Sequence, residues 1–349
     1  MISTRLISPG TTDELEKFFF GMIDNIGPKA VAAMASFQGI TDKICEAFQP
    51  FVHYMGAQRF RTPRGLEEIK RRFAWDEGNS TLYVLTEVFQ SYATMWTEGV
   101  WEIARATQSP TKFLVTDNPV TFYCKVLFKD EWTYPNDPSL KQIGTRTIFP
   151  LGLDSCLIIT HLQLVRNLWS VPTELRENPR YYDQTMKHLG DIQYGRELEE
   201  DEVLRINHVL KQRATHYVAA VDRDWLYPER RVSTTDWRAL DNDRFLLPHV
   251  WKVGFTTGVY AGGAKGAHFA ADEYGRHPWQ RRFQDRRQHD IEWFQYERSK
   301  QEWAKKRVGK SRAMTDERIG RHSVDDKMMD DFLREQGLLP PLATGESKS

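Results

Sequence analysis

The hydrophobic pattern changes its period once, near Ser109 and Pro110, and this change constrains the fold more than any other feature. Before it, apolar residues recur at helical spacing through residues 13–55, 66–73 and 82–106. After it, short β-type runs alternate with turns rich in Asp, Asn, Gly and Pro. The sequence therefore predicts an α+β fold, in which a mainly helical N-terminal half packs on a small mixed or antiparallel sheet.

Turn residues set the expected element boundaries. A helix starting near Asp13 should break at Gly27-Pro28, and another should begin after Thr41. Arginines around Pro63 should end that helix. The expected later elements are strands at 112–115, 120–128, 147–151, 155–160 and 217–221 and a helix at 200–215.

Composition limits the class of protein. Of 349 residues, 40% are hydrophobic, which supplies a sizeable core and excludes a chain disordered throughout. The 48 basic and 48 acidic residues exclude a uniformly basic nucleic-acid coat. Three cysteines without a CxxC pair argue against a disulfide framework and a thiolate zinc site. With no signal-like or membrane-length apolar run, we expect a soluble protein of the cytoplasm.

Composition also divides the chain into parts. We expect a core domain with a helical part and a sheet part, a loop-rich extension, a basic aromatic helical tail and a disordered end. The corresponding residues are 1–108, 109–225, 226–275, 276–337 and 338–349.

Four short motifs follow one another in the core. They are Arg61-Thr62-Pro63, the run Phe113 to Val120 that contains Asp117-Asn118-Pro119, Phe149-Pro150-Leu151, and a helix from Asn207 that leads to Tyr217-Val218. This series resembles the bacterial family defined by domain of unknown function 4238 (DUF4238), over about residues 13–225. The resemblance implies the fold of the family and a set of candidate site positions. The family's usual N-terminal segment has no counterpart here, so we expect that the chain starts late or that this branch has lost it.

Asp117 and Asn118 follow an expected strand, where open sheets place ligands. Asp117 could hold Mg²⁺ or Mn²⁺; alternatively, the pair forms a turn that bonds its own backbone. Arg59, Arg61 and Arg64 could bind phosphate or carboxylate. Otherwise Arg61 pairs with a carboxylate such as Asp117, so both hypotheses predict that the two lie close together.

Other reactive side chains are weaker candidates. His161 follows a strand and could act as a general base, while His208 and His216 share a helical face at wide spacing. An Arg-His ribonuclease site on this helix is a further alternative. Cys124 and Cys156 fall in apolar strands and are expected in the core. No P-loop, GxSxG or GxGxxG pattern occurs.

The segment 276–321 holds 14 Arg or Lys against 7 Asp or Glu. Its aromatic residues, such as Trp279 and Trp303, suit a helix that docks on the domain or on another copy, nucleic-acid binding, or a membrane surface. The candidate nucleic-acid contacts are Arg281, Arg282, Arg286, Arg287, Lys305, Lys306 and Arg307.

Two functions remain open. The first is a binding or regulatory module, for example in a bacterial defence or toxin-like system, with a protein or nucleic-acid partner or as a homo-oligomer. The alternative is a metal-dependent nuclease or other phosphodiester hydrolase. In it Asp117 holds the metal, Asn118 assists, Arg61 neutralises phosphate, and His161 or a metal-bound water is the base. Glu98, Glu102 and Asp154 are further ligands only if the fold brings them close.

Overall fold

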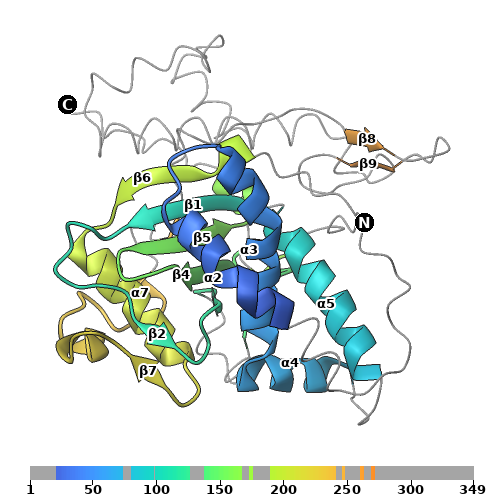
Figure 1. Ribbon diagram of the computed structural model, residues 1–349. Helices are drawn as coiled ribbons and strands as arrows, with labels where there is room; N and C mark the ends of the chain where they lie inside the picture. The colour runs from blue at the N-terminus through green and yellow to red at the C-terminus, as the bar shows by residue number, and fades with distance from the viewer. Residues whose placement is uncertain are drawn as a thin grey trace, which may run out of the picture. The chain divides into compact units, whose positions relative to one another are not determined.

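The computed structural model describes residues 21–73, 80–97, 99–125, 137–166, 173–175, 189–240, 246–247, 260–262 and 269–271 (Figure 1). The chain divides into two compact units, one formed by Met1–Val165 with Trp169–His277 and the other by Arg166–Leu168 with Pro278–Ser349. Apart from Arg166, every described residue belongs to the first unit. No helix among the described residues has the length and apolar character needed to cross a membrane.

The N-terminal part is helical, as expected. The helices are α2 (Gly21–Ala35), α3 (Asp42–Phe60), α4 (Pro63–Phe73) and α5 (Ser80–Thr97). Thr41 caps α3, because its Oγ1 accepts a hydrogen bond from the Ile44 N–H at 3.3 Å.

The expected break at Gly27-Pro28 is wrong, since α2 continues through Pro28. Gly27 lies against the ring of Tyr54 on α3, where a Cβ would collide. Packing between α2 and α3 therefore outweighs the loss of the proline N–H.

The main sheet has five strands in the order β3-β4-β5-β1-β6. They are β1 (Val100–Arg105), β3 (Thr121–Tyr123), β4 (Arg146–Pro150), β5 (Ser155–Thr160) and β6 (Gln193–Glu197). All neighbours are antiparallel except β1 and β6, which makes the sheet mixed. The α+β fold is thus confirmed.

One strand replaces an expected helix end. The helix expected over residues 82–106 is too long, because α5 ends at Thr97 and Val100–Arg105 forms β1. The first five residues of β1 are buried and the last is partly buried, because the strand lies inside the sheet with layers on both faces.

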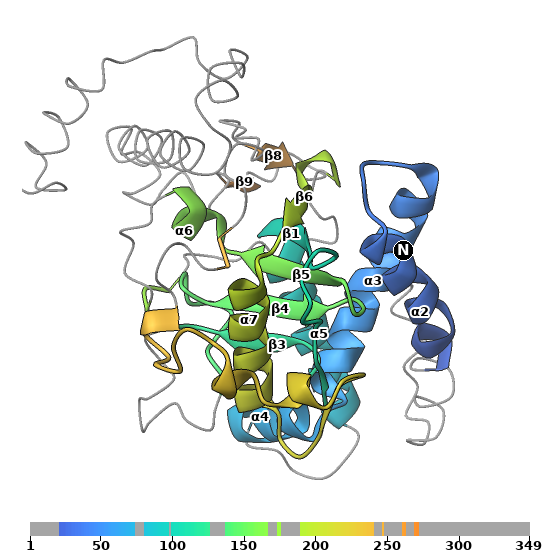
Figure 2. The same ribbon diagram turned by 90° about the vertical axis from the view of Figure 1, so that its left-hand side faces the viewer.

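The main sheet lies between helices α2, α3 and α5 on one face and α7 (Glu200–Arg213) on the other (Figure 2). Its alternating side chains build two cores. Trp101, Ile103 and Leu157 pack with residues of α2, α3 and α5. Ala104 and Ile158 pack on the other face with α7 and the later chain that includes Trp237 and Leu240. The sheet is therefore sandwiched between two layers.

Cys124 and Cys156 lie in the core as expected, and burial raises the pKa of the Cys156 thiol.

Smaller elements complete the described part of the chain. A separate antiparallel pair joins β2 (Val115–Thr116) to β7 (Val218–Ala219), so the strands expected near 112–115 and 217–221 lie outside the main sheet. The remaining elements are α6 (Leu162–Arg166), the hairpin β8 (Tyr260–Gly262) and β9 (Phe269–Ala271), and the 3₁₀ turns η2 (Leu189–Asp191), η3 (Asp224–Leu226) and η4 (Pro228–Arg230).

Candidate functional site

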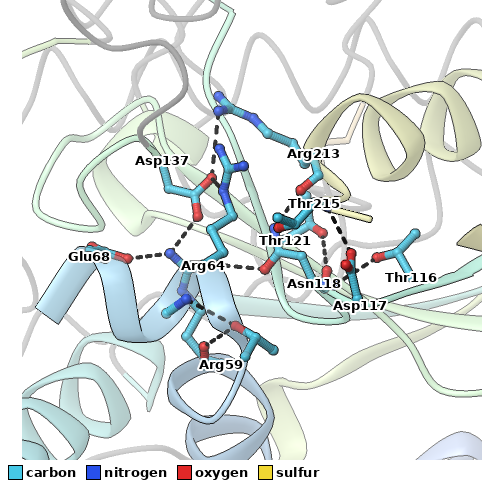
Figure 3. A network of polar contacts seen from close by, with 12 residues as sticks. Arg59, Arg64, Glu68, Thr116, Asp117, Asn118, Thr121, Asp137, Arg213 and Thr215 are labelled. Atoms are coloured by element: carbon cyan, nitrogen blue, oxygen red, sulfur yellow. Dashed lines mark hydrogen bonds and ion pairs between the residues drawn. The ribbon is translucent and has the colours of Figure 1, made fainter. Parts of the chain in front are cut away.

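The carboxylate of Asp117 is bound by the backbone that follows α7. Oδ1 accepts the N–H of Thr215 at 2.8 Å, and Oδ2 accepts those of His216 and Tyr217 at 2.6 and 3.2 Å. The Asp117 N–H donates in turn to the Tyr217 carbonyl at 3.1 Å. Asp117 therefore fastens the 215–217 turn to β2 instead of bonding its own backbone as the turn hypothesis predicted (Figure 3).

Arg61 does not contact Asp117, so the expected proximity of the two is wrong. Its Nη1 donates to both oxygens of Asp24 on α2, at 2.9 and 2.8 Å, and its side chain is 34% exposed. Arg61 follows the last residue of α3, from which its side chain reaches α2.

Arg59 makes the inward contacts that were expected of Arg61. It is fully buried, its guanidinium carbon lies 4.4 Å from the ring centre of Phe122, and its Nη1 donates to Asn118 Oδ1 at 3.0 Å. Its Nη2 pairs with Glu68 and, at 2.5 Å, with Asp137 Oδ2. The Asp-Asn-Pro motif therefore contacts the chain just before the Arg-Thr-Pro motif, through Arg59 and Asn118.

Asp137 joins arginines from three helices. In addition to Arg59 of α3, Arg64 Nε of α4 lies 3.0 Å and Arg213 Nη1 of α7 lies 3.5 Å from Asp137 Oδ1 (Figure 3). We call this set the arginine–aspartate cluster: Arg59, Arg64, Glu68, Asn118, Asp137 and Arg213.

Charge outweighs burial in this cluster. Burial alone would raise the pKa of Asp137, but the charges of Arg59, Arg64 and Arg213 hold it below its ordinary value. Burial would lower the pKa of Arg59, yet Asp137 and Glu68 raise it. Both groups are therefore ionised at neutral pH.

Short-range hydrogen bonds explain why the motifs build this cluster. Thr62 Oγ1 donates to the Arg59 carbonyl at 2.9 Å and accepts the Gly65 N–H at 3.0 Å. This turn leads from α3 into α4, and a Cβ at Gly65 would collide with the Arg59 backbone. The Arg-Thr-Pro motif thus places Arg59, Arg64 and Glu68 on one side of the α3–α4 corner.

Asn118 is held from several directions as well. Its N–H donates to Thr116 Oγ1 at 3.2 Å, and its carbonyl accepts from Thr121 Oγ1 at 2.7 Å. Its side-chain amide donates to the Arg213 carbonyl at 3.1 Å, so Asn118 links α3 to the end of α7. All of these hydrogen bonds join Asn118 to other groups of the protein.

The candidate histidines have other surroundings. His161 Nδ1 accepts the Gln163 N–H at 3.1 Å at the start of α6, and burial lowers its pKa to about 4. His208 is buried on α7, and burial also lowers its pKa. His216 Nδ1 lies 3.8 Å from Asp117 Oδ2, and its side chain is exposed.

The possible additional carboxylates do not converge on Asp117. Glu102 is buried against Arg196 at 3.0 Å, Asp154 pairs with Lys112 at 2.6 Å, and Glu98 lies outside the described residues. Within the described ranges, no three His, Cys, Asp or Glu side chains form a group that could hold a metal ion.

A second buried polar group went unnoticed in the sequence. On β6, Gly195 has a φ of 82° and lies at a bulge, so that Gln193 pairs with Glu102 and Arg196 with Ala104. Arg196 Nη1 contacts Glu102 and donates to the Leu247 carbonyl at 2.7 Å, while Nη2 contacts Glu202 at 2.5 Å. The alternating pattern of a regular strand has no bulge, so it would not have predicted the contacts of Arg196.

The tail candidates Arg281, Arg282, Arg286, Arg287, Lys305, Lys306 and Arg307 all lie outside the described residues. Comparison with protein-family models, with curated proteins and with solved structures gives no match to this chain.

Proposed function

We propose that this chain is a binding or regulatory module and not a nuclease built on Asp117. The observation that supports the proposal most directly is that both Asp117 oxygens accept backbone N–H groups of residues 215–217. A carboxylate that coordinates Mg²⁺ directs its oxygen lone pairs at the ion. Here the lone pairs are directed at amide hydrogens, so Asp117 serves the local fold.

The arginines support the same proposal. Arg59 is enclosed by Glu68, Asp137, Asn118 and the ring of Phe122. Arg61 pairs with Asp24 on the surface. Both arrangements satisfy arginines with carboxylates of the chain itself, as expected for contacts that fix helices to a sheet.

We place the contact with the partner in residues 276–312, which lie outside the described residues. The positive charge surplus of this region and its interspersed Trp, Phe and Tyr favour a polyanion, with Lys and Arg on phosphates and rings stacked on bases. Nucleic acid is therefore the partner class that we propose. The bacterial defence or toxin-like setting stays a hypothesis, because no contact of the described residues bears on it.

The test combines cleavage and binding in one set of samples. Purified wild type and Asp117→Asn are incubated with labelled single- and double-stranded DNA and RNA, in Mg²⁺ or Mn²⁺ and in chelator, and anisotropy is followed across salt. We expect intact nucleic acid and binding that weakens as salt rises. Cleavage that disappears in a folded Asp117→Asn protein would instead establish the nuclease.

A matched pair of variants tests the location. The double variant Arg281→Gln, Arg282→Gln should weaken binding and lower the salt slope by up to about 0.9 per lost phosphate contact. The control Lys43→Gln, Lys141→Gln removes the same charge from exposed sites of the described unit and should leave binding unchanged. An equal loss of affinity in both double variants would refute the placement of the contact in residues 276–312. Wild-type protein that binds no nucleic acid would refute the partner class.

A further inference from the structure

The strands β2 and β7 form a separate two-stranded pair (Figure 1). The outer face of this pair is apolar. Along the chain after α7, exposed and partly buried residues alternate, and Val218 and Ala220 pack on the core below. The alternation shows that one face of this strand is open. The exposed apolar residues of the pair, which we call the outer ribbon face, are Val115 (58% exposed), Tyr217 (75%), Ala219 and Val221 (75%).

The outer edge of β7 also carries backbone groups that can accept another strand. The register Val115 with Ala219 and the bond from the Asp117 N–H to the Tyr217 carbonyl turn the backbone groups of Tyr217 and Ala219 toward β2. Because these directions alternate along an extended chain, the groups of Val218, and of Ala220 directly after β7, point away from β2. Within the described ranges they make no hydrogen bond. An open edge of this kind is a template for strand addition.

The sequence along this edge is complementary to itself when read antiparallel. With Ala219 opposite Ala219 of a second copy, Val218 faces Ala220, so the open backbone groups meet. Tyr217 then faces Val221, an aromatic and β-branched pair of the kind that stabilises sheets. A shift by one residue would set open groups against groups already bonded to β2.

The charges at the two ends of the strand fit the same register. His216 lies two residues before β7 and Asp222 three residues after it, and both are exposed. Antiparallel pairing centred on Ala219 places His216 of one copy beside Asp222 of the other, at both ends of the contact. An imidazole N–H can donate a hydrogen bond to a carboxylate oxygen there.

We propose that two copies of this chain associate through the outer edges of β7, in antiparallel register centred on Ala219. The product is a continuous four-stranded sheet, β2-β7-β7-β2, related by a two-fold axis. The outer ribbon faces of the two copies join into one apolar face. This proposal stands independently of the proposed function.

A disulfide across the two-fold axis tests the contact. Ala219 and its counterpart form a non-hydrogen-bonded pair, with Cα atoms about 4.5 Å apart, which a disulfide can span. In a Cys45→Ser background, which removes the exposed thiol, Ala219→Cys should convert most of the protein to a cross-linked dimer under mild oxidation. Leu153→Cys, at an exposed position between β4 and β5 and outside the proposed strand contact, is the matched control and should stay monomeric on a non-reducing gel.

Mixed cysteine variants test the register. Tyr217→Cys and Val221→Cys should cross-link when the two proteins are mixed, and neither should cross-link alone. Sedimentation of the wild type should show a dimer whose dissociation constant rises at least tenfold in Val221→Lys, a change at an exposed position. A monomeric wild type, cross-linking equal to that of Leu153→Cys, or a dimer indifferent to Val221→Lys would each overturn the proposal.

Discussion

Arg59 and Arg61 stand two residues apart at the end of α3, but only Arg59 is buried. Removing Arg59 would leave Asp137 and Glu68 buried beside an empty space. We expect Arg59→Ala to lower the free energy of unfolding by about 3–5 kcal/mol. Arg61→Ala, which breaks an exposed pair, should cost at most about 1 kcal/mol. Urea unfolding followed by circular dichroism compares the two, and similar losses would contradict the assigned role of Arg59.

Asp117 is the second residue whose role can be measured alone. Its three accepted hydrogen bonds hold residues 215–217, and hydrogen bonds to charged groups contribute about 1.5–3 kcal/mol each. We expect Asp117→Ala to lower stability by about 1–3 kcal/mol, because the turn relaxes and water replaces part of the loss. Hydrogen exchange should quicken at residues 215–219 and stay unchanged in β5. Uniform acceleration would show that Asp117 supports the whole fold.

At the scale of the element, local signals predicted the helices better than the strands. The predicted ends of α3, at Thr41 and at the Arg-Thr-Pro turn, agree with the structure. Caps and turns act over a few residues, so the local sequence is enough to predict them. The sequence around β1 carries a helical pattern from α5, and only pairing with β5 and β6 makes it a strand. The Gln-Tyr-Gly-Arg-Glu run of β6 has little β propensity and was missed for the same reason.

The cap of α3 provides a test at this scale. Thr41→Ala removes the acceptor of the Ile44 N–H and should lower the free energy of unfolding by about 0.5–2 kcal/mol. Thr41→Ser keeps the hydroxyl and should retain most of the stability. Thermal unfolding of the three proteins gives the order, and a Ser variant as unstable as the Ala variant would refute the cap.

At the scale of the whole molecule, the arginine–aspartate cluster connects the helical layer, the sheet and α7. Its motifs could be found in the sequence, because Arg-Thr-Pro and Asp-Asn-Pro are local patterns. Its pairing could not, because Arg64 and Asp137 are 73 residues apart and Asp137 lies in a Pro-rich stretch without a distinctive pattern. Which arginine points inward depends on the residue at which α3 ends. Arg59 and Arg61 are only two residues apart, so composition does not distinguish them.

Acid sensitivity also belongs to the whole molecule, since three histidines in different places contribute to it. Burial lowers the pKa values of His53, His161 and His208, that of His161 to about 4, whereas an unfolded chain has a histidine pKa near 6.5. Below about pH 6.5 the unfolded chain therefore binds protons that the folded chain does not. This contribution to stability is complete above that pH and is lost progressively toward about pH 4. Below that, protonation of Asp137, whose pKa is also lowered, removes more.

A single substitution separates His161 from the other titrating groups. In His161→Asn the side-chain oxygen can still accept the Gln163 N–H at the start of α6, but the proton-binding site is gone. We expect a flatter decline of the free energy of unfolding between about pH 6.5 and about pH 4 than in the wild type. Urea unfolding across this range decides it, since an unchanged slope in His161→Asn would mean that His161 takes up its proton in the folded protein as readily as in the unfolded chain.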